Sequence, residues 1–594
     1  MTESLANARI FPKLDLSKID SCFVKETYRD GQKKCIEFAA KAFNEGKRIV
    51  ILECPTGSGK STIAMTLANM VKNSFYLTIT RILQDQLVND FDDIVELKGK
   101  TAYPCTFYER YGETIVKRKG MSQKDLEDKL MNRVDCSSGY CRSKSNQSIG
   151  SSIAKQMCES CFPKNPKSLS NKEITVNRGA LLELPMSMEY CACPYYEQVY
   201  KSIESPKVVM NFSSFLYQTS LTKRFNDVRD LLIIDEAHNI ESQILDFISF
   251  SISDQVLQTH GVFIPKLDTA LDYSAWFREI DLFATLKEMI ELAETRENSK
   301  EADEFERISK KLEIFMDHVN KENSDWVVEY NERTERNTTI RTVTLKPVLA
   351  VDFVEDLLFQ YGRKIVMLSA TILDVDVVAD SLGINRDEIA AYRMKNRFPV
   401  SNRPIFITPV AKMTGGKAKM HEWMPKLIKG VENIISKYPD QKGIIHTHNN
   451  AILDAIINQI NPKYFNRLLT QRDFPDKREL LKVHAQKKNS ILVAPAMHEG
   501  IDLRDDLSRF QIICKVPYPN FYENEQLARR INIDPKYYTW LTALKIVQSY
   551  GRSIRSETDY ADTYIIDEAI VKFLKDAKKI LPSWFLEAVI HTSK

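Results

Sequence analysis

The chain has 594 residues, of which 43% are hydrophobic and 27% charged, and its formal net charge is +3. This composition excludes disordered and fibrous proteins, and the length allows roughly four domain-sized units. No secretory signal opens the sequence, and no run of about 18 apolar residues predicts a membrane helix. We therefore expect an intracellular protein with no membrane partner. A near-neutral charge still permits a DNA-binding groove on one face.

Short apolar runs of strand composition alternate with helical patterns along most of the chain. A first series lies at 49–52, 75–79, 208–210, 231–234 and 365–368, and a second at 405–408, 443–446, 491–494, 511–516 and 563–566. Such alternation predicts parallel sheets with helices on both faces. The sequence therefore indicates an α/β fold with two domains of the same kind, the second beginning near residue 380.

A glycine-rich loop follows the first of these strands. Its sequence is Thr56-Gly57-Ser58-Gly59-Lys60-Ser61, and a helical pattern follows it. The N–H groups of such a loop surround phosphate oxygens, while Lys60 neutralises the β- and γ-phosphates and Ser61 ligates Mg²⁺. Cys54 stands where the full form of the motif has glycine. The loop predicts ATP and Mg²⁺ as cofactors.

Two segments interrupt the strand and helix rhythm. Residues 105–194 are polar and hold seven of the eleven cysteines, namely Cys105, Cys136, Cys141, Cys158, Cys161, Cys191 and Cys193. A segment with so little apolar surface needs a metal or cross-link to be ordered. Residues 246–345 show apolar residues at three- and four-residue spacing, which predicts two amphipathic helices joined near Arg296 to Lys300.

A second chemical motif directly follows the predicted strand at 231–234. Asp235 and Glu236 are delivered to the carboxyl end of this strand, where ligands bind in parallel sheets. Asp235 would hold Mg²⁺, and Glu236 would orient or deprotonate the attacking water. His238, two residues further on, would couple the nucleotide site to the second domain.

Further motifs occur in the order found in superfamily 2 helicases, which this chain resembles. They are Tyr28-Arg29-Asp30-Gly31-Gln32, Thr78-Ile79-Thr80-Arg81-Ile82-Leu83-Gln84-Asp85-Gln86, Ser369-Ala370-Thr371, Glu499-Gly500-Ile501-Asp502 and Gln548-Ser549-Tyr550-Gly551-Arg552-Ser553-Ile554-Arg555. The resemblance implies that Gln32 reads the adenine and that Gly500, Asp502 and Gln548 belong to the nucleotide site. It also implies that Arg552 and Arg555 stabilise charge on the γ-phosphate as arginine fingers.

The cysteines make the chain similar to the XPD/DinG-type branch of that superfamily. The elements Leu97-Lys98-Gly99-Lys100-Thr101-Ala102-Tyr103-Pro104-Cys105 and Cys193-Pro194-Tyr195-Tyr196 resemble the surroundings of the first and fourth ligands of its iron–sulfur cluster. The resemblance implies a [4Fe-4S] cluster, for which thiolates are suitable ligands. We favour Cys158 and Cys161 as the inner ligands, with Cys136 and Cys141 or a mixed set as alternatives. The surplus thiols could instead bind Zn²⁺.

The resemblance implies two RecA-like motor domains, an iron–sulfur module and a mainly helical arch domain. The expected boundaries are 1–104, 195–245 and 346–379 for the first motor domain, 105–194 for the module, 246–345 for the arch and 380–594 for the second motor domain. The implied function is ATP-dependent unwinding of DNA in repair, replication or recombination. The protein is expected to be a monomer that moves 5′ to 3′ on single-stranded DNA. Its expected partners are single-stranded DNA, forked duplex DNA and other proteins of a repair or replication complex. A DNA-stimulated ATPase that remodels complexes without unwinding is the alternative, and a zinc module on an inactive motor is a third reading. The expected location is cytoplasmic in a bacterium or phage and nuclear in a eukaryote.

Overall fold

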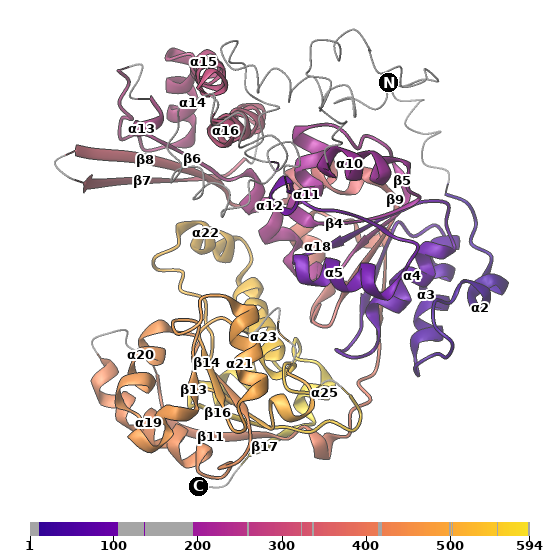
Figure 1. The fold of residues 1–594 in the computed structure, drawn as a ribbon, viewed down its shortest axis with the longest axis vertical. Helices are drawn as coiled ribbons and strands as arrows, with labels where there is room; N and C mark the ends of the chain where they lie inside the picture. Colours follow the sequence, from indigo (N-terminus) through magenta and orange to yellow (C-terminus); the bar gives the residue numbers. More distant parts are fainter. Residues whose placement is uncertain are drawn as a thin grey trace, which may run out of the picture.

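The computed structural model describes residues 11–104, 136, 194–257, 261–296, 298–321, 324–335, 338–413, 419–497, 501, 503–554 and 556–591. Figure 1 shows two α/β domains that follow one another along the long axis, with a smaller unit beside the first. None of the helices within these ranges is long and apolar enough to cross a membrane.

The first domain contains a seven-stranded sheet in which every neighbouring pair of strands is parallel. In spatial order the strands are β10 (Ile389–Arg393), β1 (Ile49–Glu53), β9 (Gly362–Ser369), β5 (Arg229–Ile234), β2 (Ser74–Thr78), β4 (Lys207–Asn211) and β3 (Val95–Leu97). Strand β10 lies beyond the expected domain boundary at residue 380, yet it pairs with β1 in this sheet. The chain therefore passes to the second sheet between Arg393 and Ile405.

The second domain contains another seven-stranded parallel sheet. Its strands in spatial order are β13 (Leu468–Leu469), β14 (Ile491–Ala494), β12 (Gly443–His446), β15 (Phe510–Ile513), β16 (Asp562–Asp567), β11 (Ile405–Ala411) and β17 (Val589–His591). The two sheets confirm the predicted α/β fold with two parallel-sheet domains.

Helices cover both faces of the first sheet, because alternate side chains of each strand point to opposite faces. In β1, Val50 and Leu52 belong to one buried cluster with α3 and α4, whereas Ile49 and Ile51 belong to another with α11 and α12. The helices of this domain are α2 (Ile19–Cys22), α3 (Gln32–Asn44), α4 (Lys60–Asn69), α5 (Arg81–Asp90), α10 (Pro194–Glu204), α11 (Phe212–Leu216), α12 (Ile240–Ile248), α17 (Val351–Leu357) and α18 (Val375–Leu382).

Helices also cover the second sheet on both faces. Its helices are α19 (Met420–Ile435), α20 (Asn450–Gln459), α21 (Lys477–Gln486), α22 (Glu525–Ile533), α23 (Pro535–Tyr550), α24 (Ala569–Asp576) and α25 (Ser583–Leu586). Ile445 of β12 is in a buried cluster with α19 and α20, and Ile444 is in another with α21. Tyr537 and Trp540 of α23 instead belong to a large buried cluster that contains residues of both domains, such as Ile51 of β1 and Ile565 of β16. Apolar contacts therefore run between the two domains along α23.

The inserted unit contains the two amphipathic helices predicted from the sequence. They are α15 (Leu282–Thr295) and α16 (Ser299–His318), preceded by α13 (Asp254–Leu257) and α14 (Ala270–Glu279). The unit also holds an antiparallel sheet that the sequence did not reveal, with strands in the order β6 (Phe250–Ser253), β8 (Thr338–Pro347) and β7 (Trp326–Glu335). Strands β7 and β8 form a long hairpin, visible at the edge of Figure 1. The outer half of β7 is exposed and polar, but the inner halves, Trp326 to Val328 and Thr342 to Leu345, carry aromatic and β-branched residues that were a missed strand signal.

Candidate nucleotide site

The phosphate-binding loop connects β1 to α4, and α4 begins at Lys60. Gly57 and Gly59 adopt left-handed backbone conformations, with φ of 79° and 81°. This is a region that other residues enter only at a cost. The hydroxyl oxygen of Ser58 is buried and has no hydrogen-bond partner among the described residues. A turn built on left-handed glycines, with a free hydroxyl and a helix N-terminus, fits a phosphate group.

Two residues upstream hold this loop in place. Gln32 is 1% exposed, and its Nε2 donates to the carbonyl oxygen of Ser58 at 2.9 Å while its Oε1 accepts from the backbone N–H of Arg29 at 2.8 Å. The guanidinium of Arg29 donates to the carbonyl oxygen of Gly57 at 2.6 Å. Both ends of the Gln32 amide are thus engaged within the protein, and Gln32 braces the loop.

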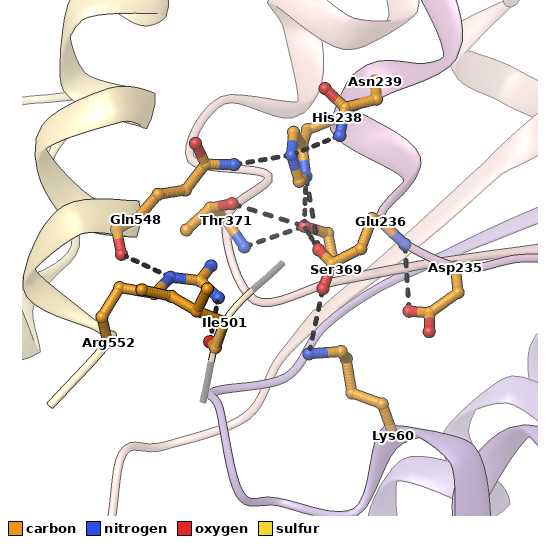
Figure 2. A network of polar contacts seen from close by, with 10 residues as sticks. All are labelled: Lys60, Asp235, Glu236, His238, Asn239, Ser369, Thr371, Ile501, Gln548 and Arg552. Carbon is orange, nitrogen blue, oxygen red and sulfur yellow. Dashed lines mark hydrogen bonds and ion pairs between the residues drawn. The ribbon is translucent and has the colours of Figure 1, made fainter. Parts of the chain in front are cut away.

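The two predicted carboxylates lie opposite the loop, as Figure 2 shows. Glu236 Oε1 lies 3.8 Å from Lys60 Nζ, and Asp235 Oδ1 accepts from the backbone N–H of Glu236 at 2.9 Å. Asp235 is 6% exposed, and its burial, reinforced by the neighbouring charge of Glu236, raises its pKa to about 6. Glu236 has a left-handed backbone with φ of 50°. A buried carboxylate beside a lysine and a second carboxylate suits a divalent cation.

His238 links this group to the second domain. Its Nε2 lies 2.6 Å from Nε2 of Gln548 on α23 and 2.9 Å from Nδ2 of Asn239, so it accepts from two amides. Its Nδ1 lies 2.8 Å from Oγ of Ser369. Ser369 Oγ in turn lies 3.4 Å from Glu236 Oε2 and accepts from the backbone N–H of Thr371 at 3.0 Å. Figure 2 shows the resulting chain of polar contacts between the two domains. The predicted coupling position of His238 is consistent with this geometry.

One cavity of about 580 Å³ brings the predicted groups together. The first domain lines it with Thr56, Gly57, Gly59, Lys60, Ser61, Asp235, Glu236 and His238, and the second with Arg504, Gln548, Gly551 and Arg552. Arg552 donates from Nη1 to the carbonyl oxygen of Ile501 at 3.1 Å and from Nε to that of Gln548 at 3.2 Å. Its guanidinium is therefore held by its own domain at the edge of the cavity.

Several predicted site residues lie outside the described residues. They are Gly500, Asp502 and Arg555 of the nucleotide site, and the expected cluster ligands Cys105, Cys158, Cys161 and Cys193. Within the described ranges, no group of three or more histidine, cysteine and carboxylate side chains could hold a metal ion. Cys136 is described, and its Sγ lies 3.2 Å from the carbonyl oxygen of Pro104, the residue before Cys105.

Some residues that line the cavity were not predicted as nucleotide ligands. Among them are Arg29, Asn396, Phe398 and Arg504. Asn396 and Phe398 lie between the two sheets in a stretch without a recognisable pattern, so only the folded chain brings them to the cleft. Two parallel-sheet domains that share a phosphate-loop cleft define a RecA-like, nucleotide-driven motor.

Comparison with protein families supports this class. The model of the helicase C-terminal domain matches residues 431–588, and that of the type III restriction enzyme res subunit matches residues 25–285. The ATP-dependent DNA helicase CHL1 of Vanderwaltozyma polyspora is 22% identical over 506 residues, which are 68% of this chain and 60% of that protein. CHL1 of Candida albicans is 33% identical over 105 residues, 14% of this chain and 12% of its own. The chain thus spans about 60% of the length of the Vanderwaltozyma polyspora relative.

Solved structures show the same fold. An XPD helicase structure aligns with 96% of this chain and 100% of its own, with a TM-score of 0.57 and 14% sequence identity. Xpd4 of S. tokodaii aligns with 95% of this chain and 100% of its own, with a TM-score of 0.51 and 12% identity. These matches show that the chain is similar to ATP-dependent DNA helicases and has the fold of XPD helicases.

Proposed function

We propose that the chain is an ATP-dependent DNA helicase that moves on single-stranded DNA and unwinds duplexes. The observation that carries the proposal is the shared cavity, in which Lys60, Asp235 and Glu236 of one motor domain face Gln548 and Arg552 of the other. A nucleotide held between two domains can drive their closure and reopening, which is how such motors move. The DNA substrate is supported by the relatives, which are named ATP-dependent DNA helicases.

Each of these cleft residues has its own proposed role in ATP hydrolysis. ATP with Mg²⁺ would supply the phosphoryl group, and Asp235 and Ser61 would hold the cation. Lys60 neutralises charge on the β- and γ-phosphates, and Glu236 orients or deprotonates the attacking water. Arg552 stabilises charge on the γ-phosphate after it leaves its contact with Ile501 as the domains close. Arg555 is proposed for the same role from its motif position.

A [4Fe-4S] cluster in residues 105–194 is a further part of the proposal. It rests on the sequence around Cys105 and Cys193, which resembles that of the outer ligands in this branch. Cys158 and Cys161 are the favoured inner pair. Cys136, whose Sγ lies 3.2 Å from the carbonyl oxygen of Pro104, belongs to the alternative sets. The cluster would order a segment that has little apolar surface of its own.

A forked-duplex assay tests the proposed helicase activity. Duplexes with a 5′ or a 3′ single-stranded tail are incubated with the protein and ATP, and strand displacement is recorded for each. We expect displacement from the 5′-tailed duplex, and none with the Lys60→Ala variant. Polarity is inferred from family resemblance, so displacement from the 3′-tailed duplex alone would correct the direction and keep the helicase.

The same assay distinguishes the helicase from the alternative function. A protein that hydrolyses ATP in the presence of single strands and displaces neither strand would be a DNA-stimulated ATPase that remodels complexes. The roles in repair, replication or recombination, the monomeric state and the protein partners belong to the proposal as family expectations. Sedimentation of the purified chain, with and without forked DNA, measures the oligomeric state directly.

A further inference from the structure

Glu53 is a buried carboxylate that stands directly before the phosphate loop. It is the last residue of β1, and its exposed fraction is 4%. Its Oε2 accepts from Nε of Arg393 at 3.0 Å and from the backbone N–H of Leu373 at 3.2 Å. Its Oε1 is buried and has no hydrogen-bond partner among the described residues. Burying a carboxylate without full hydrogen bonding costs energy, so this position is unfavourable for a glutamate that contributed only packing.

Leu373, which donates to Glu53, lies in a strained turn. Its φ is 63°, in the left-handed region that a leucine enters only at a cost, and the N–H of Asp374 donates to the carbonyl oxygen of Ile372 at 2.7 Å. Three-residue turns of this hand are rare, and such strain is typical of functional sites. The carbonyl oxygen of Leu373 accepts from Nη2 of Arg393 at 2.7 Å. Glu53 and Arg393 together hold the turn in its strained conformation.

The peptide group between Ile372 and Leu373 is bonded to both motor domains. Its N–H donates to Glu53 of the first domain, and its carbonyl oxygen accepts from Nε1 of Trp540 on α23 of the second domain at 2.9 Å. Trp540 is buried, so this contact is shielded from water. One rigid peptide group therefore connects α23 to the carboxylate at the start of the phosphate loop.

The backbone around Glu53 is bonded to the same segments as the turn. The carbonyl oxygen of Glu53 accepts from the N–H of Met394 at 2.9 Å, where the chain begins to cross to the second sheet. The N–H of Cys54 donates to the carbonyl oxygen of Ser369, four residues before Leu373, at 2.8 Å. A displacement of the turn is therefore passed to the first residues of the phosphate loop.

We propose that Glu53 is a positioning residue, through which the contact of Trp540 with the carbonyl group of Ile372 sets the phosphate loop for hydrolysis. The inference rests on the proposed ATP hydrolysis in the cleft. It adds a second connection from α23 to the nucleotide site, beside the contact of Gln548 with His238. Closure of the domains moves α23, the turn follows through Trp540, and Glu53 transfers the displacement to the strand that carries the loop.

ATP hydrolysis stimulated by single-stranded DNA tests this connection in single and double variants. Glu53→Gln keeps the side-chain shape and loses the charge, and it should lower kcat about 10- to 150-fold. Trp540→Phe keeps an aromatic ring and loses the N–H, and it should lower kcat about 2- to 13-fold. KM for ATP should stay within about threefold of wild type in both, because Lys60 and the loop glycines are unchanged. The double variant should have a kcat within about threefold of Glu53→Gln alone, since both residues act through one peptide group.

Two matched substitutions serve as controls. Glu355→Gln removes an exposed carboxylate that pairs with Arg48 just before β1. Trp423→Phe on α19 removes a buried indole N–H that has no hydrogen-bond partner among the described residues. Both should leave kcat within about twofold of wild type. Melting temperatures show that each variant is folded, and equilibrium binding of a fluorescent ATP analogue gives a readout that needs no turnover.

Two results would overturn the role of Glu53 and leave the motor intact. One is a folded Glu53→Gln variant with wild-type kcat, or, if that variant does not fold, a wild-type kcat in Trp540→Phe. The other is a double variant whose loss in kcat equals the product of the two single losses, because the residues would then act independently. Failure of the proposed function looks different: the wild-type protein would hydrolyse no ATP, or Lys60→Ala would be as active as wild type.

Discussion

Arg530 of α22 and Glu241 of α12 form a buried ion pair between the two motor domains, with Nε 2.9 Å from Oε1. Both side chains are less than one tenth exposed. Arg530 also donates from Nη2 to Oγ of Ser381 at 2.8 Å, and its guanidinium lies over the ring of Tyr537. Glu241 follows His238 by three residues, so one short segment carries both the cleft contact to α23 and this second contact to α22.

The pair makes the domain junction sensitive to the loss of either charge. Arg530→Met would leave the carboxylate of Glu241 buried without its partner, which typically costs about 3–5 kcal/mol. We expect a clear fall in melting temperature, measured by circular dichroism. The exposed ion pair between Arg386 and Asp380 provides the matched control, because Arg386→Met should shift the melting temperature little.

A double variant that removes both charges tests whether the ion pair, and not the packing around it, causes the loss of stability. In the Arg530→Met, Glu241→Gln double variant no buried charge is left alone, and much of the lost stability should return. If the double variant were as unstable as the sum of the two single variants, the two residues would not be coupled, and the ion pair would not be the source of the effect.

Two constraints require glycine at position 59. Its φ is 81°, and a Cβ atom built on it would lie 2.3 Å from Nε2 of Gln32. Gly59→Ala should therefore displace the bond from Gln32 to the phosphate loop and abolish nucleotide binding in a fluorescent-analogue titration. Gly46→Ala is the control, because Gly46 also has a positive φ, 95°, but nothing lies within 4 Å of its Cβ position. Both variants should lose about 1–2 kcal/mol of stability from backbone strain, and only the first should lose affinity.

The sequence predicted the interior strands of both sheets and none of their edges. All ten predicted runs correspond to strands within a few residues, because central parallel strands are buried on both faces and read as continuous apolar runs. In these two sheets the missed strands are β10, β3, β13 and β17, which are their four edge strands. An edge strand such as β10 is only partly buried along its length, so its sequence carries no such run.

The nucleotide site likewise contains some residues that the sequence predicted and others that it did not. The phosphate loop and the Asp235-Glu236 pair are local motifs, and the fold places both at one cavity, as expected from their strand ends. The contact of His238 with Gln548 joins residues 310 positions apart, and Phe398 comes to the cleft from a stretch without a motif. Such relationships depend on how two folded domains meet, which local spacing does not encode.

The cysteine ligands can be assigned one by one through iron content. Cys105→Ser and Cys193→Ser, purified without oxygen, should lose the brown absorption and most of the about four iron atoms per chain expected for the cluster. The same measurement on Cys136→Ser, Cys141→Ser, Cys158→Ser and Cys161→Ser should show loss in two of the four variants. Cys514→Ser is the control, because Cys514 is a buried thiol of the second sheet domain. Zinc without visible absorption in the wild-type protein would contradict the cluster and leave the motor domains unaffected.

His484 should make the second domain sensitive to mild acid. It is fully buried on α21, where its Nε2 lies 2.8 Å from the carbonyl oxygen of Leu507 and its Nδ1 lies 2.9 Å from Oγ of Ser490. These contacts fit a neutral ring that donates from Nε2 and accepts at Nδ1. Burial lowers its pKa to about 4, below the ordinary value of 6.5.

Between pH 6.5 and 4 the unfolded chain therefore binds a proton at His484 that the folded chain does not, and stability falls as the pH falls through this window. The loss from this residue amounts to about 3 kcal/mol at pH 4. In His484→Gln the position does not titrate, so urea unfolding followed between pH 7 and 4.5 should show a shallower decline than in wild type. His421→Gln, at an exposed position, should keep the wild-type slope. Equal slopes for wild type and His484→Gln would show that another group causes the acid sensitivity.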